Sequence, residues 1–394
     1  MNDVLNIAII GGGIVGCCVA WELSKTQAGI FVFEKNPGIT KGENQSSRNS
    51  GVNHAGINYD RKTRPLKARL CVEGNRLWYD FCERYQVPCQ KTGKLIVAQD
   101  AVQNRGLDRY LRRAAENGVA DVRKISGEEV QDLEPNVKAH AALFVPTSGI
   151  FEPTALLHQV YALASNQGVE FMTATEIVAL AAVAGGLRLT LCYRDGRQDS
   201  IVARRVINAA GVHAVGVARL IDPDFPIQAA LTRGDSLKFY RKRRADIYLR
   251  GMNVYPAPIV VDTPTGRHHS VGVHLTPTFD RVGAEFVIGD TVTVGPKLIP
   301  VKSLEDYQTP VPPVESFLED LSFFPGLTSA DLESHQCGVH ARLNGYPDFY
   351  IQADRTYGNV IHLLGIDSPG FTAAPAIARY VARLIDKQMI QQGA

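Results

Sequence analysis

The sequence has no strong excess of charge of either sign. Its 42 lysines and arginines are balanced by 40 aspartates and glutamates, which gives a formal net charge of +2. A nearly neutral chain has no long-range field that draws it to nucleic acid or to an anionic membrane surface. The run from Arg241 to Arg244 is the one basic cluster in the sequence, and we interpret it as a solvated turn. We therefore expect no nucleic-acid partner.

The sequence also lacks membrane-directing segments and paired cysteines. Its first apolar run begins at Val4 with no charged region before it, and no window approaches the roughly 18 apolar residues of a membrane-spanning helix. The seven cysteines form no Cys-x-x-Cys pair and no Cys/His metal spacing. We expect reduced thiols, no metal site and a cytoplasmic protein, for which peripheral association with the inner membrane stays open.

Strands and helices alternate at both ends of the chain. The apolar pattern predicts a strand at Val4–Ile10, a helix at Ile14–Thr26 and a strand at Ile30–Glu34, which together form a β-α-β unit. Near the other end it predicts a strand at Val360–Leu364 and a closing helix at Ala373–Lys387. The α/β character that opens the chain therefore returns at its end.

The middle of the chain is richer in predicted β-structure. A polar loop spans Pro37–Tyr59, an amphipathic helix Pro65–Tyr85, and a proline-containing β-region about Leu231–Val294. The expected fold class is α/β (α+β overall), a discontinuous Rossmann-like domain with an inserted, sheet-based second domain. Other expected strands are Lys94–Ala98, Val169–Thr175, Leu187–Tyr193 and Ser200–Ile207, the last two in a meander, and other expected helices are Asn104–Glu116 and Pro153–Gln167.

A glycine fingerprint lies between the first predicted strand and helix. In Gly11-Gly12-Gly13-Ile14-Val15-Gly16 the three spaced glycines permit a tight turn, close approach of backbone to a pyrophosphate, and close packing of helix on strand. The amides at the start of the helix favour an anion. Glu34, at the end of the second strand, can accept hydrogen bonds from ribose hydroxyls. The pattern predicts a dinucleotide site for either NAD or FAD.

Three further segments favour FAD over NAD. The polar loop Ser46–Gly51 replaces the next compact β-α unit of a standard dehydrogenase. The strand Val206–Gly211 ends in small residues, as needed where backbone passes close to a cofactor. The glycine-rich turn Gly365–Thr372 directly precedes a helix, so its amides can face the flavin and stabilise the reduced ring.

At this point the sequence resembles the D-amino-acid-oxidase-type FAD-dependent oxidoreductases, and among them the L-2-hydroxyglutarate oxidase or dehydrogenase family. The resemblance covers nearly the whole chain. Its most specific segments are Arg48–Ile57, Leu66–Cys71, Gly93–Ala98, Tyr255–Pro258, Gly272–Thr276 and Gly365–Thr372.

The resemblance implies two domains with different functions. It implies an FAD-binding domain of residues 1–88, 145–212 and 328–394, and a mostly antiparallel substrate domain of residues 89–144 and 213–327. The implied reaction is oxidation of a small 2-hydroxy acid, similar to L-2-hydroxyglutarate, to the 2-keto acid by hydride transfer to flavin N5. Two alternatives stay open: an amino-acid or amine oxidase of the same superfamily, and a non-catalytic flavin-binding electron-transfer subunit. The electron acceptor, whether oxygen, a quinone or a partner flavoprotein, is left open as well.

The chain departs from the wider superfamily near its C-terminus. His340 stands where many members carry an arginine that clamps a substrate carboxylate, and Arg342 lies two residues on, on the same face if the segment is a strand. A dicarboxylate needs two such contacts, because desolvated charges must be paired. The ordered candidates for these contacts are Arg342, Arg48, Tyr59 and Tyr255, of which Arg48 can equally serve the FAD phosphates.

Two histidines are the candidate bases that take the substrate's hydroxyl proton. His54 follows the polar loop, within a glycine-spaced stretch that allows close approach to the flavin. His274 lies in a segment whose alternation puts Val271, Val273 and Leu275 on one face, and Gly272, His274 and Thr276 on the other. The candidate catalytic residues are His54, His274, Arg342 and Tyr255; the candidate FAD-binding residues are Gly11, Gly13, Ile14, Val15, Gly16, Glu34, Lys35, Ser46, Ser47, Arg48, Asn49, Ser50, Gly51, Ala210, Gly211, Gly338, Gly365, Ser368, Pro369, Gly370, Phe371 and Thr372.

Overall fold

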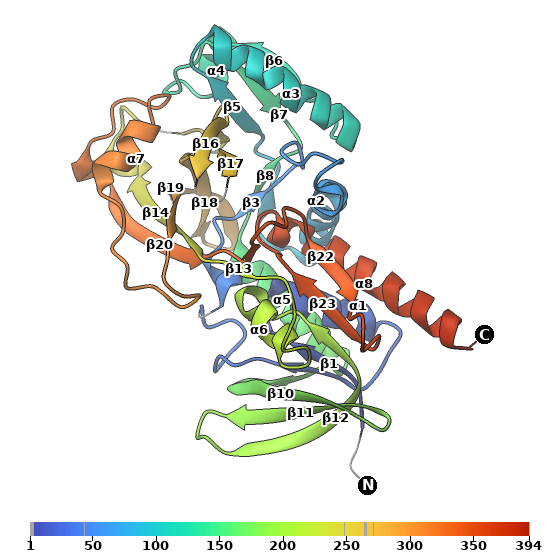
Figure 1. The fold of residues 1–394 in the computed structure, drawn as a ribbon. Helices are drawn as coiled ribbons and strands as arrows, with labels where there is room; N and C mark the ends of the chain where they lie inside the picture. Colours follow the sequence, from blue (N-terminus) through green and yellow to red (C-terminus); the bar gives the residue numbers. More distant parts are fainter. Residues whose placement is uncertain (1–3, 43, 248, 264–265, 271, 394) are drawn as a thin grey trace. The chain divides into compact units, whose positions relative to one another are not determined.

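The chain forms two compact units, each built from segments that are separate in the sequence. The computed structural model describes residues 4–42, 44–247, 249–263, 266–270 and 272–393, and Figure 1 labels most of their helices and strands. Unit 1 comprises Met1–Arg48, Pro153–Ala230 and His340–Ala394, and unit 2 comprises Asn49–Glu152 and Leu231–Val339. The mixed α/β class with several sheets agrees with the expectation from sequence.

The boundaries of the units differ from those expected. Residues 49–88 lie in unit 2, although we expected them beside the glycine fingerprint. The reason is strand pairing, because β3 (Val52–Asn53) pairs with β8 (Gly149–Phe151), which also pairs with β4 (Cys89–Gln90). Unit 1 in turn extends to residue 230, and unit 2 to residue 339. That unit 1 binds FAD and unit 2 binds substrate remains a prediction.

Unit 1 is built on an eight-stranded sheet with a parallel centre. β1 lies between β2 and β12 and runs parallel to both, and β23 runs parallel to β12. The apolar residues of β1 are nearly all buried because helices and loops cover both faces of such a sheet. The strands are β1 (Leu5–Ile10), β2 (Ile30–Phe33), β9 (Glu170–Met172), β10 (Thr175–Val183), β11 (Gly186–Tyr193), β12 (Gln198–Asn208), β22 (Tyr350–Ala353) and β23 (Val360–Leu364).

The predicted meander and the predicted helices of unit 1 are confirmed, with one error in a strand. β10, β11 and β12 form an antiparallel meander, drawn in green in Figure 1. The expected strand at Val169–Thr175 is wrong in its extent, because Ala174 adopts a positive φ of 53° and separates β9 from β10. α1 packs against α5 and α8. The other elements are α1 (Ile14–Ser24), η1 (Gln45–Arg48), α5 (Pro153–Asn166), η2 (Gly211–His213), α6 (Ala214–Arg219), β13 (Ala229–Ala230), β21 (Arg342–Leu343) and α8 (Gly370–Gly393).

Unit 2 is built on a second eight-stranded sheet in the order β20-β14-β19-β18-β15-β5-β7-β6. Every described pair in it is antiparallel except β15 with β5, which agrees with the expected mostly antiparallel domain. Its strands are β5 (Lys94–Ala98), β6 (Arg123–Ser126), β7 (Ala141–Val145), β14 (Thr232–Tyr240), β15 (Asn253–Pro256), β18 (His274–Val282), β19 (Glu285–Pro300) and β20 (Glu333–Val339); β16 (Ile259–Thr263) and β17 (Gly266–Ser270) form a separate hairpin.

The helices of unit 2 begin and end at recognisable signals. α2 (Pro65–Tyr85) has the predicted bounds, with proline in its first turn and Gln86 in the left-handed region after its end. α3 (Ala101–Asn117) starts earlier than expected because the Asp100 side chain accepts hydrogen bonds from the amides of Val102 and Gln103. The remaining helical elements are α4 (Gly127–Leu133), η3 (Arg241–Arg243), α7 (Val314–Asp320) and η4 (Ser329–Asp331). None of the helices within the described residues has the length and apolarity needed to cross a membrane.

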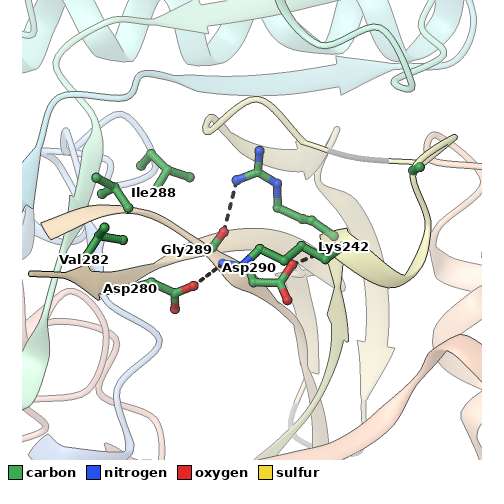
Figure 2. Close-up of a pocket in the computed structure, with 9 residues that line it drawn as sticks. Lys242, Asp280, Val282, Ile288, Gly289 and Asp290 are labelled. Carbon is green, nitrogen blue, oxygen red and sulfur yellow. Dashed lines mark hydrogen bonds between the residues drawn. The ribbon is translucent and has the colours of Figure 1, made fainter.

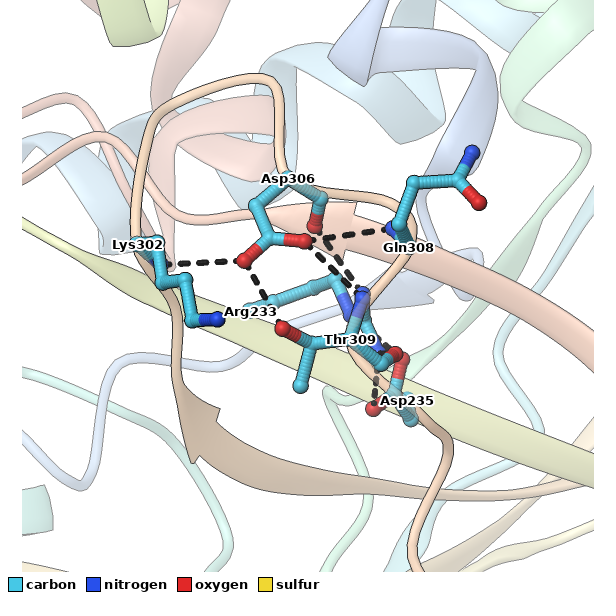
Figure 3. A network of polar contacts seen from close by, with 6 residues as sticks. All are labelled: Arg233, Asp235, Lys302, Asp306, Gln308 and Thr309. Atoms are coloured by element: carbon cyan, nitrogen blue, oxygen red, sulfur yellow. Dashed lines mark hydrogen bonds and ion pairs between the residues drawn. The ribbon is translucent and has the colours of Figure 1, made fainter.

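A buried ion pair ties a long loop to β14 in unit 2 (Figure 3). The Arg233 guanidinium, 1% exposed, donates to both carboxylate oxygens of Asp235 at 2.8 and 3.0 Å. It also donates to the carbonyls of Asp306 and Thr309 at 2.9 and 2.7 Å. One arginine therefore neutralises a buried carboxylate and holds the loop that follows β19.

Candidate functional site

The glycine fingerprint forms the predicted turn between β1 and α1. Gly11 has a φ of +108°, and a Cβ there would lie 2.5 Å from the carbonyl oxygen of Ala209. A Cβ on Gly16 would lie 2.0 Å from the carbonyl oxygen of Gly11. Only glycine fits at either position, because backbone occupies the space that a side chain needs. The turn thus leaves backbone exposed to close approach, as a pyrophosphate requires.

The start of α1 is suited to an anion. Gly13 is the N-cap and provides no side-chain cap, and the first turn contains no acidic residue. Ser46 of the polar loop reaches this turn, where its Oγ accepts a hydrogen bond from the Ile14 amide at 2.9 Å. The partial positive charge of the helix start is therefore not offset by a carboxylate in that turn. These residues fit the pyrophosphate of FAD.

Glu34 lies beside the same turn and is 5% exposed. Its Oε2 accepts from the Gly12 amide at 2.7 Å and its Oε1 from the Asn36 amide at 2.9 Å. A carboxylate has about four lone-pair positions, so these two bonds orient it and leave capacity for ribose hydroxyls. The neighbouring Lys35 ammonium lies 3.1 Å from Nε2 of His213, in the short helix η2 that begins at Gly211 after β12.

The other predicted cofactor residues divide between the units. In unit 1, Gly365 has a φ of +68° and follows β23. The turn leads into a helix as expected, but α8 begins at Gly370 and not at the predicted Ala373. In unit 2, the Asn49 side chain accepts from the Gly51 amide at 2.8 Å. Gly338 pairs with Gly234 on the neighbouring strand β14. The structure thus brings the fingerprint, Ser46 and Glu34 together in unit 1.

Unit 2 gathers two of the predicted catalytic histidines around a lysine and a tyrosine. The Lys94 ammonium lies 3.5 Å from Nδ1 of His54 and 3.9 Å from the centroid of the Tyr255 ring. The Tyr255 ring stacks on the His274 ring with centroids 3.7 Å apart. We call Lys94, His54, Tyr255 and His274 the polar cluster of unit 2. It joins three predicted residues to one that the sequence reasoning did not assign.

The alternation of the strands places this cluster on one face of the sheet. Val254 pairs with Leu275, and both lie in the hydrophobic core with Val273. Their neighbours Tyr255 and His274 point to the opposite face. The predicted two-faced pattern holds for His274, Leu275 and Thr276, where β18 begins. It does not extend as a strand to Gly272, which has a φ of +65°, and Val271 lies outside the described residues.

Burial sets the protonation of the cluster. Desolvation first, and then the charge of Lys94, hold the pKa of His54 well below its usual value. Desolvation lowers the pKa of His274 to about 3, although its hydrogen bond to the Gly272 carbonyl opposes this shift. Desolvation also raises the pKa of the Tyr255 hydroxyl. Both imidazoles are therefore neutral near pH 7, so each has a ring nitrogen with a lone pair.

The predicted carboxylate clamp looks different in the structure. β20 ends at Val339, and the Arg342 amide donates to the His340 carbonyl at 2.8 Å, so the segment turns instead of continuing as a strand. His340 and Arg342 therefore do not lie on one face of a continuous strand, as the predicted clamp required. The Arg342 guanidinium pairs with the Asp367 carboxylate at 3.0 Å, which links it to the Gly365–Thr372 turn. Tyr59, another candidate, is buried beside Arg64 in unit 2.

A surface hollow on the β18–β19 hairpin makes a poorer site (Figure 2). Its charged groups already serve the hairpin: the Arg241 guanidinium donates to the Gly289 carbonyl at 3.0 Å, and Asp280 accepts from the Asp290 amide at 2.8 Å. Within the described ranges, no group of three His, Cys, Asp or Glu side chains is arranged to hold a metal ion.

Comparison with known proteins gives the chain its family. The family model "FAD dependent oxidoreductase" matches residues 6–384. L-2-hydroxyglutarate dehydrogenase of Caenorhabditis elegans is 30% identical over 81% of this chain and 69% of its own length, and that of Arabidopsis thaliana is 28% identical over 97% and 83%. Glycerol 3-phosphate oxidase of Mycoplasma pneumoniae is 28% identical over 99% and 97%.

Solved structures agree in fold. The L-alpha-glycerophosphate oxidase from Mycoplasma pneumoniae with FAD bound superposes with a TM-score of 0.82 at 24% identity, covering 98% of this chain and 95% of that one. Glycine oxidase from Geobacillus kaustophilus reaches a TM-score of 0.76 at 17% identity, covering 97% and 94%. With the family match and a glycine turn that fits a pyrophosphate, this chain belongs to the FAD-dependent oxidoreductases of the DAO family and uses FAD as its cofactor.

Proposed function

We propose that this protein oxidises the CH–OH group of a small 2-hydroxy acid, similar to L-2-hydroxyglutarate, to the corresponding 2-keto acid. Several relatives named L-2-hydroxyglutarate dehydrogenase support this substrate class. Others are named for glycerol 3-phosphate, which also carries an alcohol and an anionic group, so that substrate is the second candidate. FAD supplies the hydride acceptor for either reaction.

The observation that carries the proposal is the pair of neutral imidazoles in the polar cluster of unit 2. Oxidation of an alcohol releases a hydroxyl proton, and a neutral histidine can accept it. In His274 the Nδ1–H donates to the Gly272 carbonyl at 3.1 Å, because a carbonyl oxygen can only accept. Nε2 of His274 therefore carries the lone pair. His54 is the second candidate base.

In this proposal, FAD is bound by the residues around the glycine turn. Gly11, Gly13 and the amides that start α1 bind the pyrophosphate, and Ser46 lines that turn. Glu34 accepts from the ribose hydroxyls. The turn Gly365–Thr372 presents its amides to the flavin.

An anaerobic substrate panel tests the proposal. The purified yellow protein is mixed with L-2-hydroxyglutarate, L-malate, glycerol 3-phosphate, glycine, sarcosine and D-amino acids, and flavin absorbance is followed. Bleaching by a 2-hydroxy acid at the lowest concentration and highest rate is the expected result. Preference for glycerol 3-phosphate would support the second candidate. Preference for an amine, or no bleaching by any compound, would contradict the proposal and favour an amine oxidase or an electron-transfer subunit.

A further inference from the structure

Lys94 is a buried lysine for which the described part of the chain provides no acidic partner. It is 3% exposed and opens β5. Its ammonium lies against His54 after β3 and Tyr255 on β15. Its charge also acts on Cys71 of α2 and on His274 of β18. None of these is anionic near neutral pH, and the described residues place no carboxylate in ion-pair contact with Lys94.

Such a lysine is costly to keep in the folded protein. An ammonium removed from water without a counter-charge is destabilised, so burial lowers the pKa of Lys94 to about 7. The neighbouring Tyr255 ring contributes only a weak cation–π attraction. A methionine would fill the same space without this cost, so the amine calls for a reason beyond packing.

A second observation points to a ligand on the same sheet face. Asn253 is in register with Lys94 across the β15–β5 pair, and its Oδ1 is buried with no hydrogen-bond partner among the described residues. The Tyr255 hydroxyl and the Oγ1 of Thr276 are likewise buried with no hydrogen-bond partner among the described residues. Buried polar atoms are almost always hydrogen-bonded. Three such atoms on one face, beside an amine without a counter-charge, therefore indicate a polar binding site.

We propose that Lys94 binds an anionic group of the substrate and takes up a proton from solvent as it does so. This inference rests on the proposed function. Both candidate substrates carry a terminal anionic group, which is a carboxylate in the 2-hydroxy acid and a phosphate in glycerol 3-phosphate. Binding converts the neutral amine to an ammonium that pairs with the anion, and no covalent bond changes. Lys94 is thereby a specificity residue for anionic alcohols.

The surrounding groups do not compete for this proton between pH 7 and 9. The pKa values of His54 and His274 lie below this range, and burial raises those of the Cys71 thiol and the Tyr255 hydroxyl above their usual values. In this range, the proton taken up by the cluster therefore goes to Lys94.

The test uses the FAD-loaded enzyme with inert anions. Glutarate and inorganic phosphate are titrated calorimetrically at pH 8 in two buffers of different ionisation enthalpy. Glutarate cannot react because it has neither a hydroxyl nor a keto group. The wild type is expected to take up close to one proton with the preferred anion. Lys94→Met is expected to weaken binding roughly 10- to 100-fold and to abolish uptake. Lys94→Arg, always charged, is expected to bind without uptake. Lys138→Met, at an exposed site, is the matched control.

Three outcomes would overturn the inference. They are unchanged affinity and uptake in Lys94→Met, loss of FAD from that variant with intact glutarate affinity per loaded molecule, and failure of both anions to bind the wild type. The two proposals fail separately. Flavin bleaching by a 2-hydroxy acid together with normal glutarate binding by Lys94→Met would remove only this inference. Lys94-dependent proton uptake without bleaching by any alcohol would remove only the proposed function.

Discussion

At the scale of single residues, Lys94 also couples folding to pH. Its pKa falls from an ordinary value of 10.5 to about 7 in the folded protein, so between these values the unfolded chain binds more protons. Stability must therefore rise with pH across this window, by up to about 1.4 kcal/mol per unit for one proton. Urea unfolding at pH 7, 8 and 9 should show this rise relative to Lys94→Met. Parallel curves for the two proteins, with Lys138→Met as reference, would contradict it.

Arg233 and Asp235 form the pair whose loss should cost most stability. Removing the guanidinium leaves a carboxylate that is 1% exposed without its counter-ion. We expect Arg233→Met to destabilise unit 2 by about 3–5 kcal/mol, and Arg233→Met with Asp235→Asn to recover part of this loss. The exposed pair Arg197–Asp195 is the control, and Arg197→Met should leave stability nearly unchanged because water screens this pair. Equal losses in Arg233→Met and Arg197→Met would show that burial does not govern the pair.

The residues that could be predicted from sequence are those whose role follows from local spacing. Gly11, Gly16 and Glu34 belong to one β-α-β unit, so their predicted roles follow from the spacing of residues within one short segment. Lys94 could not be assigned in this way, because Tyr255 and His274 belong to β15 and β18, far along the chain. The available signal was a lysine at the head of an otherwise apolar, buried strand.

At the scale of elements, the β1–α1 turn should tolerate no side chain at Gly11. Gly11→Ala forces a Cβ to 2.5 Å from the Ala209 oxygen at a φ of +108°. We expect a nearly colourless protein with little bound FAD, because the turn moves away from the pyrophosphate. Gly216→Ala is the control, since a Cβ there meets nothing within 4 Å. Circular dichroism separates loss of FAD from loss of fold, and full FAD content in Gly11→Ala would refute the role of the turn.

The two faces of β18 should respond differently to substitution. Leu275 packs in the core, so Leu275→Ala should cost about 2–5 kcal/mol of stability while flavin reduction per bound FAD stays near wild type. His274→Ala should keep bound flavin but slow its anaerobic reduction roughly 10²- to 10⁴-fold, as loss of a general base does. His54→Ala should behave in the same direction. Wild-type reduction rates in both histidine variants would exclude them as bases.

Elements with a strong local pattern were predictable, whereas short ones were not. α2 and β5 have the predicted bounds because their periodicity and flanking residues are unambiguous. The predicted strand Val169–Thr175 covers β9 but only the first residue of β10, so β10 was missed. The positive φ of Ala174, which separates the two strands, has no signature in an alanine. β3 is a strand only through its pairing with β8, which also pairs with β4, so no local pattern marks these short strands.

At the scale of the whole molecule, the interleaving of two units could be foreseen but their boundaries could not. Returning α/β character at the C-terminus indicated a discontinuous domain. The boundaries depend on pairings such as β3 with β8, which carry residues 49–88 into unit 2. That unit 1 binds FAD and unit 2 binds the substrate is still a prediction, which measurements on the proposed substrates must test.

The most direct measurement is single-turnover flavin reduction by L-2-hydroxyglutarate that carries deuterium at C2. If the enzyme removes this hydrogen as hydride, mixing without oxygen should bleach the flavin and release one 2-oxoglutarate per FAD. The deuterated substrate should then react several-fold more slowly than the protiated one. Flavin that stays oxidised with this and every other 2-hydroxy acid, in a protein with full FAD content, would contradict the account.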